Sequence, residues 1–270
     1  MAKGIIILSE ARSGSEWLGS LTNRTGKLGQ SHEWFNPSIY DEPKRNKWNA
    51  DRFIDGVLDK ASTANRFFSI KLFPEQLFQF FRTYRIDPIR AIRARNDVRF
   101  LVLERRDRLR QAVSLVRATQ TGQWTSAYPR TGDTAYDFGA ICQAWLRIGR
   151  SVTFWRDYRD LEGIEAHAFV YEDLASDPMP WIDAYLDHSG EKPDISLQTE
   201  LRVQQDAETR GWMERFSIEA RERGVLETVC PPAPDEGTSR LMRKFRRKIE
   251  KFGPGTAKGR TILETEAHGR

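Results

Sequence analysis

Two short segments of the chain carry side chains suited to holding anions, and each follows a run of apolar residues. The first, residues 9–15, reads Ser-Glu-Ala-Arg-Ser-Gly-Ser and lies between the run Gly4–Leu8 and a helical pattern. A small-residue loop between a strand and a helix gathers backbone N–H groups and a helix N-terminus around one point, which favours a phosphate. Arg12 adds a positive charge, and Ser13 and Ser15 add hydroxyl donors. Ordinary strand-to-helix turns have the same composition, so this loop alone defines no function.

The second segment follows the apolar run Val98–Leu103 and contains Arg106 at its end. A helical pattern comes next, with one apolar face made by Leu109, Ala112, Val113 and Val116. Beside that face, the same periodicity aligns a polar stripe of Arg110, Ser114, Arg117 and Thr121. This pattern predicts a second anion site, in which Arg106 and Ser114 hold the ligand. The alternative is a solvated arginine face.

Several common kinds of site are disfavoured by the motifs. Residues 9–15 match neither the GxxxxGK[ST] loop of Walker-type kinases nor the GxGxxG loop of dinucleotide-binding folds. Cys142 and Cys230 form no CxxC pair, and His32-Glu33 is not part of an HExxH motif because position 36 is Asn36. We therefore expect no metal site.

The elements that must position both segments alternate along the chain. Short apolar runs that suit strands are separated by helical patterns: Gly4–Leu8, Phe67–Leu72, Val98–Leu103 and Ala166–Tyr171. Near-continuous apolar strands between amphipathic helices predict an α/β fold with a central, mainly parallel sheet flanked by helices. Ligands collect beyond the carboxyl ends of such strands, so both anion segments should face one crevice.

Charge and proline content divide the chain into three parts. We predict a body over residues 1–229, a proline-rich linker over 230–239 and a basic helix and tail over 240–270. Residues 237–260 carry a local net charge of +8, whereas the whole chain carries +5, so the rest of the chain sums to −3 and is slightly acidic. Nucleic-acid binding by the body is therefore disfavoured. The tail helix has one apolar stripe, which either docks on the body or contacts an anionic surface such as a membrane. The longest opening apolar run is too short for a membrane span or a secretory signal, so we expect a cytoplasmic protein.

Taken in order, five segments of the body resemble the sulfotransferases, most closely the bacterial trehalose 2-sulfotransferase family. Arg12-Ser13-Gly14-Ser15 with Trp17 is similar to the family's 5′-phosphosulfate loop, and Arg106 with Ser114 is similar to its 3′-phosphate motif. The other three matches are Gln111–Ser114 with Thr119–Trp124, the YEDLxxDP-like segment Tyr171–Pro178, and Gly211-Trp212 with Phe216. The resemblance implies a P-loop-like three-layer fold.

The resemblance also implies an activity and roles for particular residues. The donor would be 3′-phosphoadenosine 5′-phosphosulfate, bound by Arg12, Ser13, Gly14, Ser15, Trp17, Arg106 and Ser114, and Arg12 would also act in catalysis. The acceptor would be a hydroxyl of a carbohydrate or glycolipid, and no metal would take part. Glu33, which precedes an aromatic pair, is similar to the family's general base, with His32 as its rival.

Other positions leave alternatives open. Trp34, Phe35 and Trp124 either stack on a sugar or belong to the core, and Lys71 matches a family lysine of unassigned role. Glu16 stands where the family usually has threonine or serine, so either its carboxylate points away from the phosphates or the grip on the donor is altered. Competing functions are a P-loop phosphotransferase and a non-catalytic 3′-phosphonucleotide-binding protein. The identity of the acceptor and the choice between a monomer and a homodimer are left open by the sequence.

Overall fold

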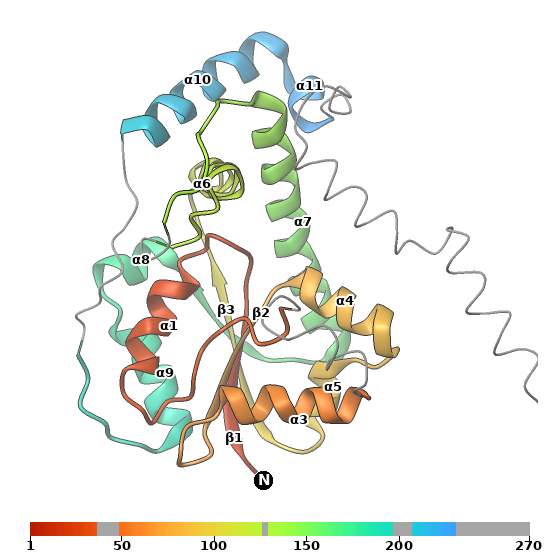
Figure 1. Cartoon of the computed structure of the whole chain (residues 1–270), viewed down its shortest axis with the longest axis vertical. Coiled ribbons are helices and arrows are strands. Elements are labelled where there is room, and N and C mark those ends of the chain that lie inside the picture. The colour runs from red at the N-terminus through yellow and green to blue at the C-terminus, as the bar shows by residue number, and fades with distance from the viewer. Residues whose placement is uncertain (37–48, 126–128, 197–206, 231–270) are drawn as a thin grey trace, which may run out of the picture. The chain divides into compact units, whose positions relative to one another are not determined.

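The computed structural model describes residues 1–36, 49–125, 129–196 and 207–230 (Figure 1). The chain divides into two compact units, Met1–Val229 and Cys230–Arg270, and the described residues belong to the first unit except for Cys230. The predicted basic helix and tail, and the linker after Cys230, lie outside the described residues.

A parallel sheet forms the centre of the first unit, as the alternating pattern predicts. Its strands lie in the order β2-β1-β3-β4 and are all parallel: β1 (Lys3–Leu8), β2 (Phe68–Leu72), β3 (Asp97–Glu104) and β4 (Ala166–Val170). The expected strand bounds are correct to within one residue. The difference matters most at Tyr171, which was expected to end the last strand and instead begins α8 (Tyr171–Ser176). Because β1 pairs with both β2 and β3, the chain reverses its winding direction between β1 and β3.

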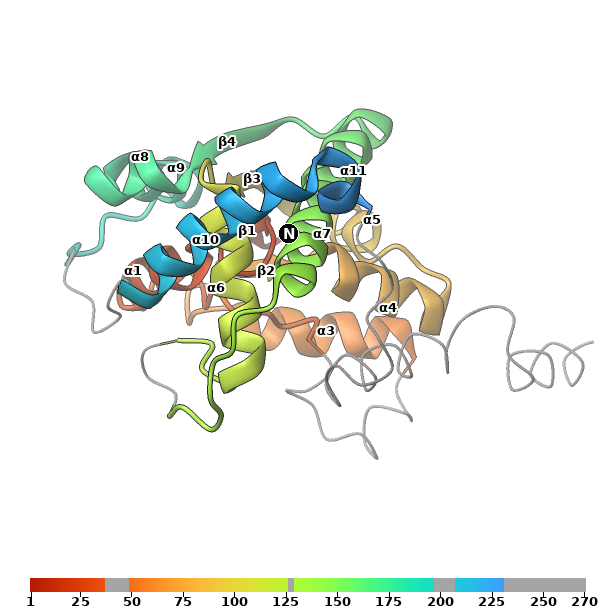
Figure 2. The same cartoon turned by 90° about the horizontal axis from the view of Figure 1, so that it is seen from above.

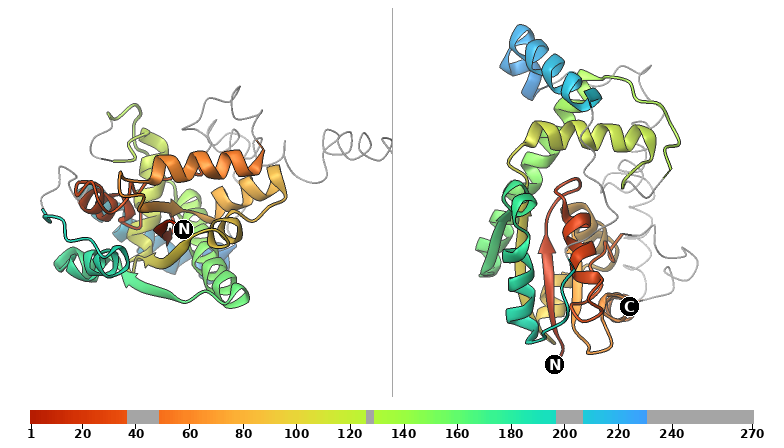
Figure 3. Two further views of the ribbon diagram at one scale, coloured as in Figure 1. Left: turned by 90° about the horizontal axis from the view of Figure 1, so that it is seen from below. Right: turned by 90° about the vertical axis from the view of Figure 1, so that its left-hand side faces the viewer.

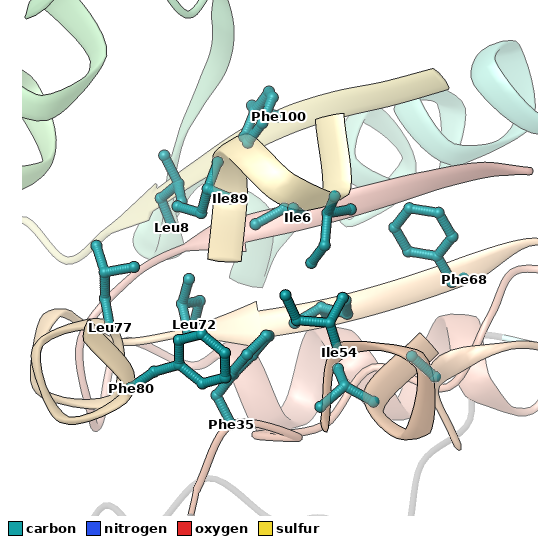
Figure 4. Packing of buried hydrophobic residues seen from close by; sticks show 14 of the residues in the cluster. Ile6, Leu8, Phe35, Ile54, Phe68, Leu72, Leu77, Phe80, Ile89 and Phe100 are labelled. Atoms are coloured by element: carbon teal, nitrogen blue, oxygen red, sulfur yellow. The ribbon is translucent and has the colours of Figure 1, made fainter. Parts of the chain in front are cut away.

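One face of the sheet is covered by helices that follow β1 and β2 in the chain. These are α3 (Ala50–Ala61), α4 (Pro74–Tyr84) and α5 (Pro88–Arg93). Ile6 and Leu8 of β1 point into this cluster, where they meet Ile54, Leu77 and Ile89 (Figure 4). The alternate β1 residues, Ile5 and Ile7, are buried on the other face. Burial on both faces explains why β1 is continuously apolar from Ile5 to Leu8.

The other face is covered by α1 (Ser15–Asn23), α8 (Tyr171–Ser176) and α9 (Met179–Ser189). Figure 3 shows α1 and α9 on one side of the strands and α3 on the other. Leu18 and Leu21 of α1 pack there with Trp181 and Tyr185 of α9. The predicted three-layer α/β arrangement is therefore confirmed.

A third cluster of helices lies beyond the carboxyl ends of the strands (Figure 2). It consists of α6 (Arg108–Thr121), α7 (Phe138–Glu162), α10 (Ala207–Arg223) and the short α11 (Val225–Val229). The predicted apolar face of α6 is confirmed, since Ala112, Val113 and Val116 are buried in this cluster. Asp107 caps α6 by accepting a hydrogen bond from the Arg110 N–H. None of the helices in the described ranges combines the length and the hydropathy needed to cross a bilayer.

Candidate functional site

The loop after β1 is shaped by two residues with left-handed backbone conformations. Arg12 has a φ of 64° and Gly14, which caps α1, has a φ of 91°. A Cβ atom at Gly14 would also lie 2.1 Å from the Tyr171 ring, so position 14 needs glycine both for its backbone and for its space. Turns of this kind orient successive N–H groups inward and create a concave site for an anion.

A buried carboxylate at position 10 anchors this loop to α7. Glu10 is 4% exposed and accepts hydrogen bonds from the Ala11 N–H at 2.7 Å and the Ser151 hydroxyl at 2.5 Å. The Arg147 guanidinium forms an ion pair with the Glu10 carboxylate, with Nη2 3.1 Å from Oε1. The buried charge is therefore paired and hydrogen-bonded, and the start of the loop is held rigidly.

The loop also contains a polar group that fits an anionic ligand. Ser13 is buried, and within the described part of the chain its hydroxyl has no hydrogen-bond partner. A buried hydroxyl without a partner is costly, so such a group in a native fold calls for an explanation. A phosphate or sulfate oxygen placed in the loop would supply the missing partner.

Arg12 links this loop to α6. Its Nε donates to the Ser114 hydroxyl at 2.9 Å, and its Nη1 donates to the Trp124 carbonyl oxygen. Burial, together with the nearby charges of Arg105 and Arg117, lowers the pKa of Arg12 to about 10. The guanidinium thus stays charged at neutral pH, and it connects residues from both predicted anion segments.

The loop after β3 approaches the same point through a neighbouring arginine. Arg105 donates to the Arg12 carbonyl oxygen at 3.1 Å, and only 11% of its side chain is exposed. Burial lowers its pKa. Sequence reasoning missed Arg105, although its place directly after β3 is the same signal that selected Arg106.

Arg106 occupies a different environment. Its guanidinium pairs with the Asp173 carboxylate at 2.7 Å, and its side chain is 62% exposed. The structure brings Ser114 to Arg12, and it records no contact between Ser114 and Arg106 among the described residues. The predicted fork of Arg106 and Ser114 is therefore not assembled here, because the acidic first turn of α8 attracts Arg106.

The rest of the predicted polar stripe on α6 is engaged with protein groups. Arg110 pairs with Asp107 at 3.0 Å, and the Thr121 hydroxyl donates to the Arg117 carbonyl oxygen at 2.8 Å. Arg117 pairs with Glu208 of α10 at 2.6 Å. α10 also carries Trp212 and Phe216, which the resemblance placed in a segment closing over the donor, and both rings are buried in the cluster with α6 and α7.

Glu33 lies beside the carboxyl end of β2, in a segment that extends the sheet by one bridge. His32 is paired in parallel with Ile70, and its carbonyl oxygen accepts from the Lys71 N–H at 3.0 Å. Glu33 Oε2 accepts from Gln76 at 3.1 Å and from Asn36 at 3.4 Å. These two donors orient the carboxylate, and Glu33 Oε1 lies 3.5 Å from the Lys71 ammonium.

Glu16 belongs to the same group, which resolves where its carboxylate points. Glu16 Oε2 lies 2.5 Å from Lys71 Nζ, and Oε1 lies 3.9 Å from His32 Nδ1. Burial raises the pKa of Glu16, but the Lys71 ammonium more than offsets this, so the net pKa is below its ordinary value. Burial lowers the pKa of His32 despite the nearby Glu16. The residue that departs from the family pattern is thus turned toward Lys71.

The aromatic candidates fall into three environments. Phe35 is 3% exposed and packs in the core against Phe53 and Phe80, so its ring is a core ring and has no face open to a sugar (Figure 4). Trp17 and Trp34 are partly buried: Trp17 packs edge-on against Tyr171, and Trp34 donates to the Gln30 carbonyl oxygen at 2.6 Å. Trp124 is 45% exposed, and its backbone is bound by Arg12.

A separate cavity of about 600 Å³ lies between α7 and α11 and shares no residue with these loops. It is lined by Arg108, Trp145, Arg150, Phe154 and Val229, among others. The polar groups that converge at the carboxyl ends of β1 and β2 therefore define the site better than cavity size does.

The α/β fold carries a loop after β1 that is suited to an anion, a buried arginine that joins this loop to α6, and a carboxylate beside β2; this combination is compatible with a group-transfer enzyme. The chain belongs to the Stf0 sulphotransferase family, whose pattern matches residues 4–219. Two trehalose 2-sulfotransferases are similar to it. The protein from Mycobacterium tuberculosis (strain ATCC 35801 / TMC 107 / Erdman) is 26% identical over 258 residues, which cover 82% of this chain and 96% of the relative. The protein from Mycolicibacterium smegmatis (strain ATCC 700084 / mc(2)155) is 24% identical over 257 residues, with the same coverage.

Proposed function

We propose that this sulfotransferase moves a sulfuryl group from 3′-phosphoadenosine 5′-phosphosulfate to a hydroxyl of a carbohydrate or glycolipid, with Glu33 as general base. The observation that carries the proposal is the bond from Arg12 to Ser114, because it joins the two anion segments at the point where the winding of the sheet reverses. Ligands of open α/β sheets bind at such points. A donor with phosphate groups at both ends suits two adjoining basic loops.

The loop after β1 would hold the phosphosulfate end of the donor. Among the described residues the buried Ser13 hydroxyl has no hydrogen-bond partner, and Gly14 allows the backbone to approach closely. Ser15 begins α1, whose N-terminus has no side-chain cap. Arg12 supplies the charge, and Trp17 follows in the first turn of α1. Arg106 and Ser114 would hold the 3′-phosphate, which requires Arg106 to exchange Asp173 for the ligand.

The reaction balances without a metal or a redox partner. A bond forms between the acceptor oxygen and sulfur, while the bond between sulfur and the bridging oxygen breaks and its electron pair leaves with the phosphate. The Arg12 guanidinium would stabilise the charge that develops on the leaving phosphate. The proton of the acceptor hydroxyl passes to a base.

Glu33 suits the role of that base better than His32 does. Its carboxylate is fixed by Gln76 and Asn36, and its side chain remains 32% exposed, so a hydroxyl can reach it. Burial lowers the pKa of His32, which makes its imidazole a weaker base. His32 Nε2 is 3.3 Å from Asn23 and Nδ1 faces Glu16, so both ring nitrogens already face protein groups.

The acceptor class rests on the two relatives, whose names specify trehalose. Trp124 offers an exposed indole next to Arg12, and aromatic faces of this kind bind sugar rings. Trp34, beside Glu33, is partly buried. These positions support a carbohydrate acceptor without distinguishing a free sugar from a glycolipid.

The proposal is tested by following labelled sulfate. The full chain is incubated with the ³⁵S-labelled donor, first with trehalose and then with fractionated bacterial glycans and glycolipids, and the labelled product is identified by mass spectrometry. Adenosine 3′,5′-bisphosphate at a hundred times its Kd should stabilise the protein by about 2.7 kcal/mol, and ATP should not. Stabilisation by the bisphosphate without any labelled product would indicate a binding protein, and stabilisation by ATP alone would indicate a phosphotransferase.

A further inference from the structure

We propose that Glu16 is the counter-charge that allows Glu33 to take up a proton, acting through the Lys71 ammonium that the two carboxylates share. This inference rests on the proposed function, because it assigns Glu16 a positioning role for the base of that reaction. Nothing in the similarity to other sulfotransferases supplies this role, since those enzymes usually lack a carboxylate at this position.

The topology brings these three side chains together from distant parts of the chain. Lys71 is paired with Ile7 across β1 and β2, so its side chain points to the face of the sheet that α1 covers. Glu16 lies in the first turn of α1, directly after the anion-binding loop. Glu33 arrives along the free edge of β2.

The distances show how the ammonium is shared. Lys71 Nζ lies 2.5 Å from Glu16 Oε2 and 3.5 Å from Glu33 Oε1. The two carboxylate oxygens are therefore at most about 6 Å apart, and both lie close to the same cation. The Lys71 side chain is only 2% exposed, whereas those of Glu16 and Glu33 are 41% and 32% exposed. Water can therefore reach the carboxylates and is excluded from the ammonium.

The burial of Lys71 makes its pairing consequential. A buried ammonium is strongly disfavoured unless a negative charge compensates it. When Glu33 takes the proton from the substrate hydroxyl, it becomes neutral and no longer compensates the charge of Lys71. Glu16, which lies closer to the ammonium, continues to compensate that charge. Without Glu16, protonation of Glu33 would leave a buried cation unpaired, so Glu33 would hold a proton less readily and would be a weaker base.

The other groups around this cluster do not change charge when Glu33 takes up a proton. His32, next to Glu33, has a lowered pKa and is neutral at neutral pH. Gln76 from α4 contacts Glu33 and is uncharged. Arg12 from the loop stays cationic across the working range of pH. Lys71 and the two carboxylates are therefore the charges that decide the balance.

The test is the pH dependence of sulfate transfer in Glu16→Gln, which keeps the size of the side chain and removes its charge. We expect turnover at neutral pH to fall several-fold, by at most about tenfold, and the acid limb of the kcat/KM profile to move to lower pH by about one unit, because one nearby charge typically shifts a pKa by about that much. Affinity for adenosine 3′,5′-bisphosphate, measured by calorimetry, should be unchanged or higher because a negative charge near its phosphates is gone. An unchanged acid limb in Glu16→Gln would overturn the inference.

Three further variants separate this role from a general loss of structure. Glu16→Asp keeps the charge and should retain an acid limb close to that of the wild type. Glu16→Gln combined with Lys71→Met removes both charges and should return the acid limb to the wild-type position or above it. Glu191→Gln removes a surface carboxylate 3.9 Å from Lys27 and should change neither quantity. An acid limb in the double variant that stays as low as in Glu16→Gln would also contradict the proposal.

A measurement without turnover keeps this inference distinct from the proposed function. The side-chain carboxyl of Glu33 is titrated by carbon-13 NMR in the full chain saturated with adenosine 3′,5′-bisphosphate, and the midpoint should be lower in Glu16→Gln than in the wild type. If no acceptor is ever sulfated, the proposed function fails while this titration still decides the role of Glu16. If sulfate is transferred and the midpoint does not move, the role of Glu16 alone is wrong.

Discussion

At the scale of single residues, two cations, Arg12 and Lys71, lie at the centre of the candidate site. Each is held by groups from distant parts of the chain: Arg12 by Ser114 and the Trp124 carbonyl, and Lys71 by Glu16 and Glu33. Low exposure strengthens these interactions because water screens them weakly. The positions of both charges are therefore fixed before any ligand binds, which reduces the reorganisation needed during group transfer.

The role of Glu33 predicts a separation of turnover from binding. Replacing Glu33 by glutamine should lower kcat by roughly 10²- to 10⁴-fold, because the acceptor's proton has no base, while donor affinity stays near normal. Steady-state kinetics with the labelled donor and calorimetry with adenosine 3′,5′-bisphosphate measure the two effects. Normal turnover in this variant would mean that His32 or another group is the base.

The role of Arg106 predicts a loss of donor affinity. Arg106→Ala should weaken binding of adenosine 3′,5′-bisphosphate by about 1.5 to 3 kcal/mol, roughly ten- to a hundred-fold, because a charged hydrogen bond to the 3′-phosphate is lost. Arg90→Ala is the matched control, since Arg90 is also exposed and paired with a carboxylate, Glu162, far from the loops. Equal affinities of the two variants in calorimetry would remove Arg106 from the donor site.

The strand-loop-helix unit from β1 to α1 is the element on which the proposed donor binding depends. Glu10 fastens its beginning to α7, and Tyr171 of α8 packs over its end at Gly14. The loop is therefore clamped between two other elements instead of being a free turn. A clamped loop keeps its N–H groups oriented, and this favours an anion over a neutral ligand.

This clamping predicts that two glycines with similar backbone angles differ in their tolerance of substitution. Gly14→Ala should destabilise the fold by more than about 1 kcal/mol and abolish donor binding. The added methyl group disfavours the positive φ at this position and clashes with the Tyr171 ring. Gly26 also has a positive φ, of 62°, but an added Cβ there would meet no atom within 4 Å. Gly26→Ala should therefore lower the free energy of unfolding by only about 1 kcal/mol. Thermal denaturation of the two variants with and without adenosine 3′,5′-bisphosphate measures the difference, and similar melting temperatures would contradict the clamp.

The described unit is held together at the scale of the whole molecule by three apolar clusters, one on each face of the sheet and one beyond its carboxyl edge. Polar groups buried between these layers make stability sensitive to pH. His188 joins α9 to the start of β3, where its Nε2 lies 3.2 Å from the Asp97 carbonyl oxygen and its ring packs against Phe67. Burial lowers the pKa of His188 below the ordinary value of 6.5.

A histidine pKa that is lower in the folded state fixes the direction of the pH effect. Below about pH 6.5 the unfolded chain binds more protons than the folded one, so the free energy of unfolding should decrease as pH falls. His32 adds to this decrease, and Glu16, whose folded pKa is depressed, contributes stability at neutral pH that is lost at still lower pH. Urea denaturation between pH 7.5 and 5.5 measures the trend. His188→Gln should flatten it, and a variant with the wild-type slope would exclude His188 as a source.

The local pattern of residues was enough to predict the α/β class, the strands and the apolar face of α6. These depend on interactions between near neighbours: alternation or continuity of apolar residues in β1, and a 3.6-residue repeat around Val113. The same pattern singled out Arg12, which stands in the small-residue loop after the first strand, whereas Glu33 was selected through the resemblance of its segment to the sulfotransferase family.

The partners of each charged side chain were decided by the tertiary structure. Ser114 faces Arg12 instead of Arg106, Arg105 contacts the loop after β1, and Phe35 enters the core. Glu16 meets Lys71 although 55 positions separate them. Spacing along a sequence fixes which face of an element a side chain occupies, but the elements that pack against that face are chosen by the burial of apolar surface throughout the fold. Long side chains then turn to whichever opposite charge this packing brings within reach.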